Sequence, residues 1–497
     1  MELKLTRETL RYERLAAACE EQVSVEGEAT LTGSMRDAIT VLSVQAQAVV
    51  SAVQPGVEEA GIRGRVCFQV LYTQGDLTRI RALETTCDFE HKLRMPGIAP
   101  GMQTEVYAAV QETEGRAGSG RMTLRALLRL SAEAFDMQQQ ELVADVSGGD
   151  GLYKQMHSVT CCCSELLGEE TAFAREEFDL PARLGADEVL TATGTAHVAD
   201  IAGGNGRVSV SGTVEVSVIH RPQESGRALV MTAHELPYEV AIPAQLAEGA
   251  EMTARAEVID VMADCIAADK RRTLRAEAQV RVRLSMCRRS EMTLLDDLYT
   301  LRGEEAVPVR EEIAVHTCRM STDARESLRV QASLPEGAPP MGEMLACFVQ
   351  PSLTALNPSG RRLDAEGTLK ITLIYLPVDS DIPYAVHVRE PFAVTFPVEA
   401  GEGVRGLLTA QESSAACVTS DRAEVRCVLG LHARAHGIRR LRAVTDVEMR
   451  PSEKAGNGFV LVWPAEGETR WETARRLRVA PESLKSAGNN ALLAFRR

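Results

Sequence analysis

The chain of 497 residues has few aromatic side chains and only two tryptophans. Aromatic residues make up 4% of it, so its cores must be assembled from Val, Leu, Ile and Ala. Basic residues are in deficit as well: 55 Lys and Arg stand against 70 Asp and Glu, which gives a net charge of −15. This charge argues against nucleic acid as a partner, because binding to phosphates needs a basic face.

The sequence also lacks long apolar runs. The N-terminus, MELKLTRETLRYERLAAACEE, has no apolar segment of the signal-peptide kind. No run approaches the roughly 18 apolar residues that a membrane-spanning helix needs. The twelve cysteines are scattered through the chain and do not form a short disulfide framework. We therefore expect a cytoplasmic protein with reduced thiols and no transmembrane segment.

Motifs that carry chemistry are scarce. The run Cys161, Cys162 and Cys163 could belong to a metal or redox site, or to a strand or linker of small residues. Adjacent residues of a strand point to opposite faces, which favours the second interpretation. The pair His432 and His436 has helical spacing but lies in a strand-like run, which favours surface placement. We predict no enzyme, no metal site and no cofactor.

Three segments of the chain repeat one pattern. In each, a glycine is followed by apolar residues at every second position, the period of a strand with one buried face. An aromatic residue follows 25 or 26 positions after the glycine: Phe89, Tyr238 or Phe392. The segments are GRVCFQVLY from Gly64, GTVEVSVIH from Gly212 and GTLKITLIY from Gly367. The repeated glycine predicts a positive φ or a close approach of another group.

A spacing of about 150 residues is too long for a solenoid unit and predicts tandem domains. Short strands separated by Gly, Pro and Asp turns favour a β-sandwich for each. We predict a mainly β protein with sandwich-like repeats at residues 1–146, 177–301 and 313–449, and linkers near 147–176 and 302–312.

The repeats resemble the SPOCS domain of spore-forming bacteria. The resemblance rests on VLSVQAQAVVSAV (41–53), GRVCFQVLY and the F-x-x-x-x-L-x-M-P pattern from Phe89, with two later echoes. It implies a sporulation protein of the developing spore envelope.

Residues 457–497 differ from the repeats in charge and in pattern. Residues 451–497 hold eight Lys and Arg against five Glu, and both tryptophans. Thr469 and Glu472 have capping-box spacing, which predicts a helix start. Pro481 suits the start of a second helix, and Gly488 its end. We predict a small α+β (βααβ) unit with a core of Trp471, Ala474, Leu477 and Leu484, in which the two large tryptophans supply much of the buried area.

This unit resembles a LysM domain, a family that binds N-acetylglucosamine-containing glycans. The segment EGETRWETARRLRVAPESL carries the resemblance, although Glu468, Arg470 and Gly488 depart from the family pattern. The resemblance implies a partner-binding or glycan-binding surface formed by Gly467, Glu468, Thr469, Arg470, Gly488 and Asn489. Arg470 is expected to point outward, one residue around the helix from Trp471.

Two functions follow from the resemblances. The first is a non-catalytic assembly protein on the mother-cell side of the developing spore surface, whose LysM-like unit docks to a spore-coat scaffold protein. The second is a wall protein that binds peptidoglycan.

Overall fold

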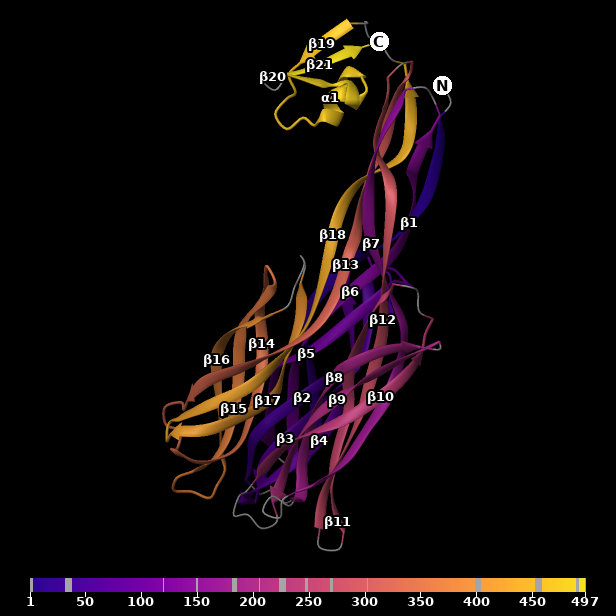
Figure 1. Ribbon diagram of the computed structural model, residues 1–497. Helices are drawn as coiled ribbons and strands as arrows, with labels where there is room; N and C mark the ends of the chain where they lie inside the picture. Colours follow the sequence, from indigo (N-terminus) through magenta and orange to yellow (C-terminus); the bar gives the residue numbers. More distant parts are fainter. Residues whose placement is uncertain are drawn as a thin grey trace.

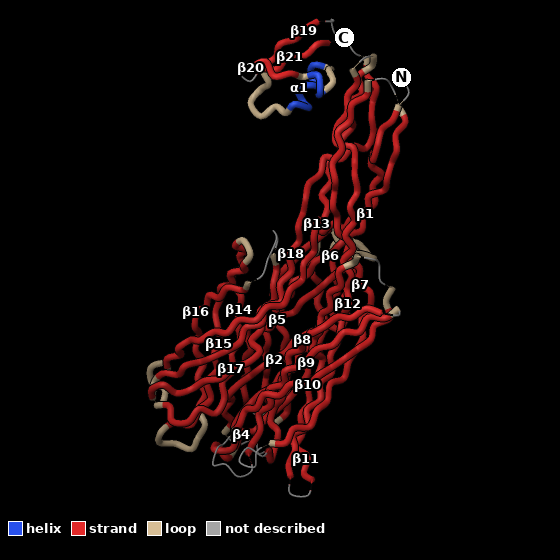
Figure 2. Tube along the Cα trace, viewed as in Figure 1, coloured by secondary structure: helices blue, strands red, loops and turns tan. Residues whose placement is uncertain are grey.

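The structure is a computed structural model of the chain. It describes residues 3–31, 38–118, 120–148, 151–180, 186–204, 206–222, 229–245, 249–268, 271–301, 303–397, 404–451, 458–488 and 491–496. Strands make up most of the described residues, and the one α-helix among them lies near the C-terminus (Figure 2). The prediction of a mainly β protein is confirmed. No described helix is long and apolar enough to cross a membrane.

The strands fall into three sets of six, which we call modules 1, 2 and 3. Module 1 contains β1 (Lys4–Thr30), β2 (Ile39–Pro55), β3 (Glu59–Gln74), β4 (Asp76–Arg94), β5 (Gln103–Gly118) and β6 (Arg121–Ser147). Module 2 contains β7 (Leu152–Asp179), β8 (Ala186–Gly204), β9 (Arg207–Pro222), β10 (Val230–Pro243), β11 (Glu251–Ala268) and β12 (Arg271–Thr300). Module 3 contains β13 (Glu305–Ser333), β14 (Met341–Ser359), β15 (Arg362–Pro377), β16 (Tyr384–Phe396), β17 (Arg405–Thr419) and β18 (Arg422–Arg450).

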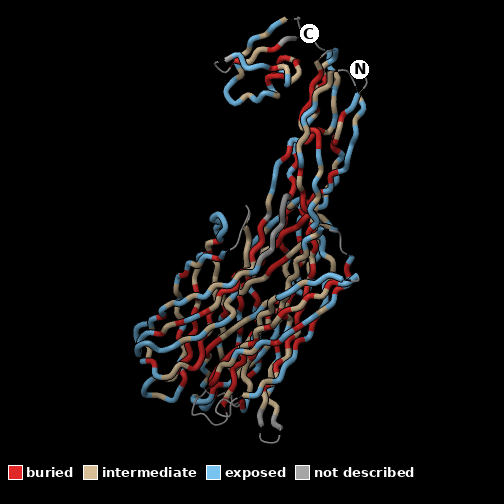
Figure 3. The backbone as a smooth tube through the Cα atoms, in the orientation of Figure 1, coloured by how far each residue is buried: buried red, intermediate tan, exposed pale blue. Residues whose placement is uncertain are grey.

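Each module consists of two antiparallel three-stranded sheets. One sheet joins its first, sixth and fifth strands, as in β1-β6-β5, and the other joins its second, third and fourth, as in β2-β3-β4. The two sheets enclose a common apolar core, to which Val66 and Phe68 of β3 and Leu124 of β6 contribute. The alternating positions of the three repeated segments are buried in all three modules. Figure 3 shows buried, intermediate and exposed residues along the whole backbone. The period-two pattern of the sequence therefore located the core strand of each module.

The repeated glycines lie directly opposite aromatic residues. Gly212 pairs with Tyr238 across β9 and β10, and Gly64 and Gly367 pair with Phe89 and Phe392 in the same way. A Cβ atom on Gly212 would lie 1.9 Å from the carbonyl oxygen of His197 and 2.6 Å from the Tyr238 hydroxyl. None of the three glycines has a positive φ. Close approach is thus the reason for the glycine.

The boundaries between modules differ from the predicted linkers. β6 ends at Ser147 and β7 begins at Leu152, so most of the predicted linker 147–176 is a strand that pairs with β12. β13 begins at Glu305, within the second predicted linker. The outer part of β7 carries polar residues on both faces, so its sequence does not show the alternation of a half-buried strand.

The three modules close into a ring around a common axis. The fourth strand of each module contacts the second strand of the next: β4 contacts β8, β10 contacts β14 and β16 contacts β2. Leu71, Ile219 and Ile374, each seven residues after its repeated glycine, meet in one apolar cluster. The modules therefore pack together into one body with pseudo-threefold symmetry and are not separate tandem domains.

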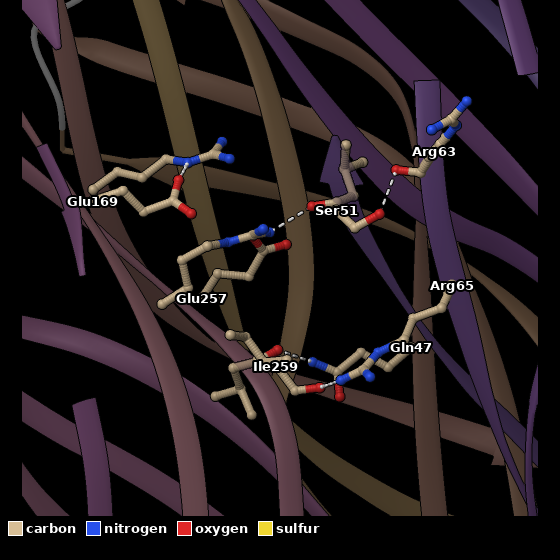
Figure 4. A network of polar contacts seen from close by, with 11 residues as sticks. Gln47, Ser51, Arg63, Arg65, Glu169, Glu257 and Ile259 are labelled. Carbon is tan, nitrogen blue, oxygen red and sulfur yellow. Dashed lines mark hydrogen bonds and ion pairs between the residues drawn. The ribbon is translucent and has the colours of Figure 1, made fainter. Parts of the chain in front are cut away.

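Side chains on one module bind backbone carbonyl groups of the next. Between modules 1 and 2, Gln47 donates to the carbonyl of Val258 (3.0 Å) and Arg65 to that of Ile259 (2.8 Å), as Figure 4 shows. Arg281 donates to the carbonyl of Val50 (2.6 Å) and also pairs with Glu257. The equivalent of Gln47 in module 3 is Gln350, which donates to the carbonyl of Val110 in module 1 (3.1 Å). Such satisfied polar contacts fix the angle between neighbouring modules.

The first and last strands of each module extend beyond the sandwiches into what we call the stem (4–14, 136–147, 152–163, 288–300, 305–316 and 438–450). Its interior contains two apolar clusters to which all three modules contribute, and Leu10, Val159 and Val315 belong to one of them. Figure 1 shows the stem projecting from the ring, with the C-terminal unit at its far end.

The C-terminal unit contains β19 (Gly458–Val462), the helix α1 (Arg470–Leu477), a 3-10 turn η2 (Pro481–Ser483), β20 (Lys485–Gly488) and β21 (Ala491–Arg496). Its sheet order is β19-β21-β20. The predicted βααβ arrangement is not observed, because the second predicted helix is a single 3-10 turn. Gly488 ends a strand, not a helix.

Candidate functional site in the C-terminal unit

The helix α1 begins as the sequence predicts. Thr469 is the N-cap, and its hydroxyl accepts a hydrogen bond from the backbone N–H of Glu472 (3.2 Å). Glu472 accepts in return from the backbone N–H of Thr469 (2.7 Å), which lowers the pKa of its carboxyl. This reciprocal capping box satisfies two backbone donors at the exposed helix start. Arg478, in a left-handed conformation with φ 55°, ends the helix.

The core of the unit contains most of the predicted residues. Ala474 and Leu477 of α1 and Leu484 are buried, together with Val479. Trp471 is half-buried and packs on this core, but Trp463 is 61% exposed. The hypothesis that both tryptophans fill the core of the unit is therefore wrong for Trp463.

Trp471 binds the C-terminal unit to the stem. Its indole Nε1 donates to Oδ2 of Asp297 on β12 (2.8 Å), and its ring meets Tyr299 edge to face, with centroids 5.0 Å apart. Arg475, one turn along the helix, donates to both oxygens of Asp297 (2.9 and 3.0 Å). Arg310 of β13 reaches the same carboxylate (2.7 Å). Asp297 is only 6% exposed, so it is a buried charge with three donors.

We call the contact of Trp471 and Arg475 with Asp297 the seat of the C-terminal unit. A second set of contacts surrounds it. The buried hydroxyl of Tyr299 donates to the carbonyl of Val479 (2.7 Å), and burial raises the pKa of that phenol. Arg478 donates to the carbonyl of Thr300 (2.9 Å). Tyr153 donates to Glu482 (2.9 Å), and this hydrogen bond raises the pKa of its phenol. The apolar core of the unit is therefore continuous with that of the stem tip.

The predicted binding residues are largely occupied within the unit. Glu468 forms a two-point ion pair with Arg476 (2.8 and 3.0 Å), which lowers the pKa of its carboxyl. Arg470 donates to the carbonyls of Pro481 (2.9 Å) and Leu484 (2.6 Å). Its side chain is exposed, as expected, and it also ties α1 to the 3-10 turn.

The remaining predicted binding residues lie near the start of the helix and at the end of β20. Gly467 lies in the turn before the helix with φ 81°, and Thr469 serves as the cap. Gly488 lies at the end of β20, and Asn489 falls outside the described residues.

The unit instead exposes an apolar sheet face. Phe459 (76% exposed) and Leu461 (49%) lie at alternate positions of β19, and Trp463 (61%) directly follows the strand at the next alternate position. Leu493 lies opposite Leu461 on β21 and is half-buried. Val460 and Val462 point the other way, into the core. We call Phe459, Leu461, Trp463 and Leu493 the outer face.

The structure shows where the cysteine run and the histidine pair of the sequence lie in the fold. Cys161 and Cys162 are fully buried in β7, which agrees with the strand interpretation of this run. Among the described residues, no group of three or more His, Cys, Asp or Glu is arranged to hold a metal ion. His432 is not on the surface as expected: it lies inside the ring, hydrogen-bonded to Asp323 (2.7 Å). The side chain of His436 falls outside the described part.

The sequence did carry a signal for the outer face. The strand FVLVW is apolar at every position, whereas a strand with one solvent-exposed face alternates with polar residues. An unbroken apolar strand therefore places apolar side chains on both sides of the sheet. Asp297 and Tyr299 gave no comparable signal, because their role depends on a tertiary contact with a distant segment.

A comparison with known protein families finds a match for one part of the chain. Residues 37–115 match the family described as SipL, SPOCS domain. The matched segment lies within module 1, from the start of β2 almost to the end of β5. No LysM domain is shown for the C-terminal unit. The chain matches no curated protein and no solved structure.

Proposed function

We propose that this protein is a non-catalytic docking protein of the developing spore envelope. The SPOCS domain in module 1 supports a role related to the spore coat. Modules 2 and 3 repeat the strand order of module 1, and we extend the SPOCS assignment to them on that basis. The setting we propose is the mother-cell side of the forming spore.

The outer face of the C-terminal unit carries the proposal. Large apolar side chains exposed together on a small domain mark an interaction site, and aromatic residues dominate the energetics of such sites. β19 is also an edge strand, so a partner can add backbone hydrogen bonds to it. We propose that a spore-coat scaffold protein packs against this face.

The ring and the stem act as a rigid support in this proposal. The stem carries the C-terminal unit away from the ring, and the seat on Asp297 holds it with its helix toward the stem. The outer face belongs to the other side of the sheet from the core that meets the stem. The seat therefore leaves the docking surface available.

Peptidoglycan binding is the second candidate, favoured by the LysM-like pattern of the sequence. It accounts less well for the structure, because Glu468 and Arg470 are engaged inside the unit.

A binding experiment on the full chain distinguishes the two candidates. The immobilised protein is offered a purified coat scaffold protein from the same sporulating organism and, separately, insoluble peptidoglycan. We expect saturable retention of the scaffold and no enrichment on peptidoglycan. Retention on peptidoglycan without scaffold binding would contradict the proposal and support the second candidate.

A further inference from the structure

One end of module 3 points away from the stem. The pairing of β13 with β18 runs from the stem to Ser333 at its far end. The segment that follows is held to the end of β17, because the backbone N–H of Met341 donates to the carbonyl of Ser420 (2.7 Å). It also holds the loop after β15, where the backbone N–H of Val378 donates to the carbonyl of Pro340 (3.1 Å). This end of the ring and the C-terminal unit therefore lie at opposite ends of the molecule (Figure 1).

Large apolar side chains are exposed together at this far end. They are Val378 (60% exposed), Ile382 (45%), Tyr384 (41%) and Val418 (59%), and we call them the distal patch. Val378 and Ile382 belong to the loop 378–383 between β15 and β16. The corresponding hairpin of module 1 has only Gly75 between its two strands. The longer, partly apolar loop thus distinguishes module 3 from module 1, and grouped apolar exposure of this kind marks an interaction site.

Two carboxylates lie within the same loop. Asp379 and Asp381 are exposed and stand between the apolar residues Val378 and Ile382. Neither carboxylate has an ion pair or a hydrogen bond within the described part of the chain. An apolar patch with two unpaired negative charges is complementary to a surface that presents apolar side chains together with a cation.

The outer face of the C-terminal unit has this complementary chemistry. Leu493 of β21 lies directly opposite Leu461 of β19 on one side and Lys485 of β20 on the other. Directly opposite residues of a sheet have their side chains on the same face, so Lys485 adds a cation to the apolar outer face. Its side chain is exposed, and it has no ion pair or hydrogen bond with any residue that the structure describes.

The net charges of the two parts agree with this match. Residues 451–497 carry eight Lys and Arg against five Glu, a net charge of +3. The whole chain has a net charge of −15, so the remainder carries −18. Opposite charges on two surfaces favour their encounter and fix their relative orientation.

We propose that the outer face of one copy of this protein binds the distal patch of a second copy, so that the chain associates end to end. Phe459 and Trp463 of one copy pack against Val378 and Ile382 of the next, and the ammonium group of Lys485 pairs with the carboxylates of the loop. Because two different surfaces meet, the contact is not closed by a twofold axis, and each added copy leaves one surface of either kind free. The product is an open row of molecules. The contact is small, so its dissociation constant should be on the order of tens of micromolar.

This association goes beyond the proposed function and needs no scaffold protein. The outer face binds one partner at a time, so a scaffold protein on that face would displace the second copy. The test below uses the purified chain alone. A negative result therefore leaves scaffold binding untouched, and a chain that fails to bind the scaffold protein can still associate end to end.

Sedimentation velocity of the full chain over a concentration series tests the proposal. The mean sedimentation coefficient should rise with concentration, and it should rise less at about 0.5 M salt than at about 0.05 M salt. Two variants each block one surface: Val378→Ser/Ile382→Ser in the distal patch and Phe459→Ser/Trp463→Ser in the outer face. The control Val57→Ser alters an equally exposed apolar residue in a loop of module 1 and should associate as the unmutated chain does.

Mixing the two blocked variants is the decisive step. Each should remain a monomer alone, whereas the mixture should form a dimer that grows no further, since one variant keeps its outer face and the other its distal patch. Dimer formation also shows that both variants are folded. A concentration-independent monomer in the unmutated chain would overturn the proposal. Association of the distal-patch variant with itself would overturn it as well, because two outer faces would then be in contact.

A charge exchange tests the role of Lys485. Lys485→Glu alone, and Asp379→Lys/Asp381→Lys alone, should each weaken the association roughly tenfold. The chain that combines all three substitutions has the charges exchanged and should associate to within about threefold of the unmutated chain. A combined variant as weak as the product of the separate losses would overturn the assigned pairing of Lys485 with the loop.

Discussion

The indole of Trp471 donates a hydrogen bond to the carboxylate of Asp297, a residue 174 positions away in the chain. The same carboxylate accepts from Arg475 and Arg310, so one buried acidic group joins the C-terminal unit to two modules of the ring. The stem thus holds the C-terminal unit through a defined charged contact as well as through apolar packing.

Asp297→Ala should release the C-terminal unit from the stem. The change removes an acceptor from the indole and two guanidinium groups, at a cost of roughly 1–3 kcal/mol for hydrogen bonds to a charged group. In a Trp463→Phe background Trp471 is the sole tryptophan, and its fluorescence should shift to longer wavelength as the ring becomes hydrated. The control Asp296→Ala alters the neighbouring, more exposed carboxylate and should leave the emission unchanged.

Gly212→Ala should destabilise module 2 strongly. The added methyl group would meet the His197 carbonyl and the Tyr238 hydroxyl, and overpacking of this kind costs about 1–3 kcal/mol or more. Gly204→Ala is the matched control, because a Cβ atom there has open space. Urea unfolding followed by circular dichroism should show a lower midpoint for Gly212→Ala only, and equal midpoints would refute the close-approach explanation.

These two predictions concern one feature that the sequence pattern indicates, the repeated glycine, and one that it does not, the contact between Trp471 and Asp297. The glycine, the alternating strand and the later aromatic residue could be recognised because they recur within one module and follow the two-residue period of a strand. The ring could not be predicted, since each contact between modules depends on the relative placement of segments about 150 residues apart. The stem strands were missed for a related reason: their burial comes from the other modules, and residues such as Cys161 have no apolar pattern in their own segment.

In the C-terminal unit, too, some features could be predicted from the sequence and others could not. The capping box of Thr469 and Glu472 was correctly predicted because it is a local arrangement within four residues. The exposure of Arg470 could be predicted from its position on the helix, but the two carbonyl groups that it binds could not, because they belong to the segment that follows the helix.

Arg470→Ala should destabilise the C-terminal unit. It removes both hydrogen bonds that connect α1 to the turn at Pro481 and to Leu484, so the helix end and the turn should separate more readily. Amide hydrogen exchange over α1 should accelerate in this variant. Lys485→Ala, a change at an exposed residue of the same unit, is the control. Unchanged protection in Arg470→Ala would show that these bonds contribute nothing to the fold.

The C-terminal unit should lose stability in acid. The ion pair with Arg476 and the backbone contact lower the folded-state pKa of Glu468 below its ordinary value of 4.5. A lowered folded pKa means stability that is present above the unfolded value and is lost as the pH falls through the folded value. Hydrogen exchange of α1 should therefore rise as the pH falls below 4.5, after correction for the intrinsic exchange rate. Glu468→Gln should show a smaller rise, and an identical pH profile would contradict this assignment.

The most direct test of the docking account is the affinity of the full chain for the purified coat scaffold protein. The outer-face variant Phe459→Ser/Trp463→Ser is compared with Phe173→Ser, which alters an aromatic residue of the same high exposure in module 2. Loss of aromatic anchors should weaken binding by at least about thirtyfold, while Phe173→Ser binds as the unmutated chain does. Undiminished scaffold binding by a folded outer-face variant would contradict the assignment of this face as the docking surface.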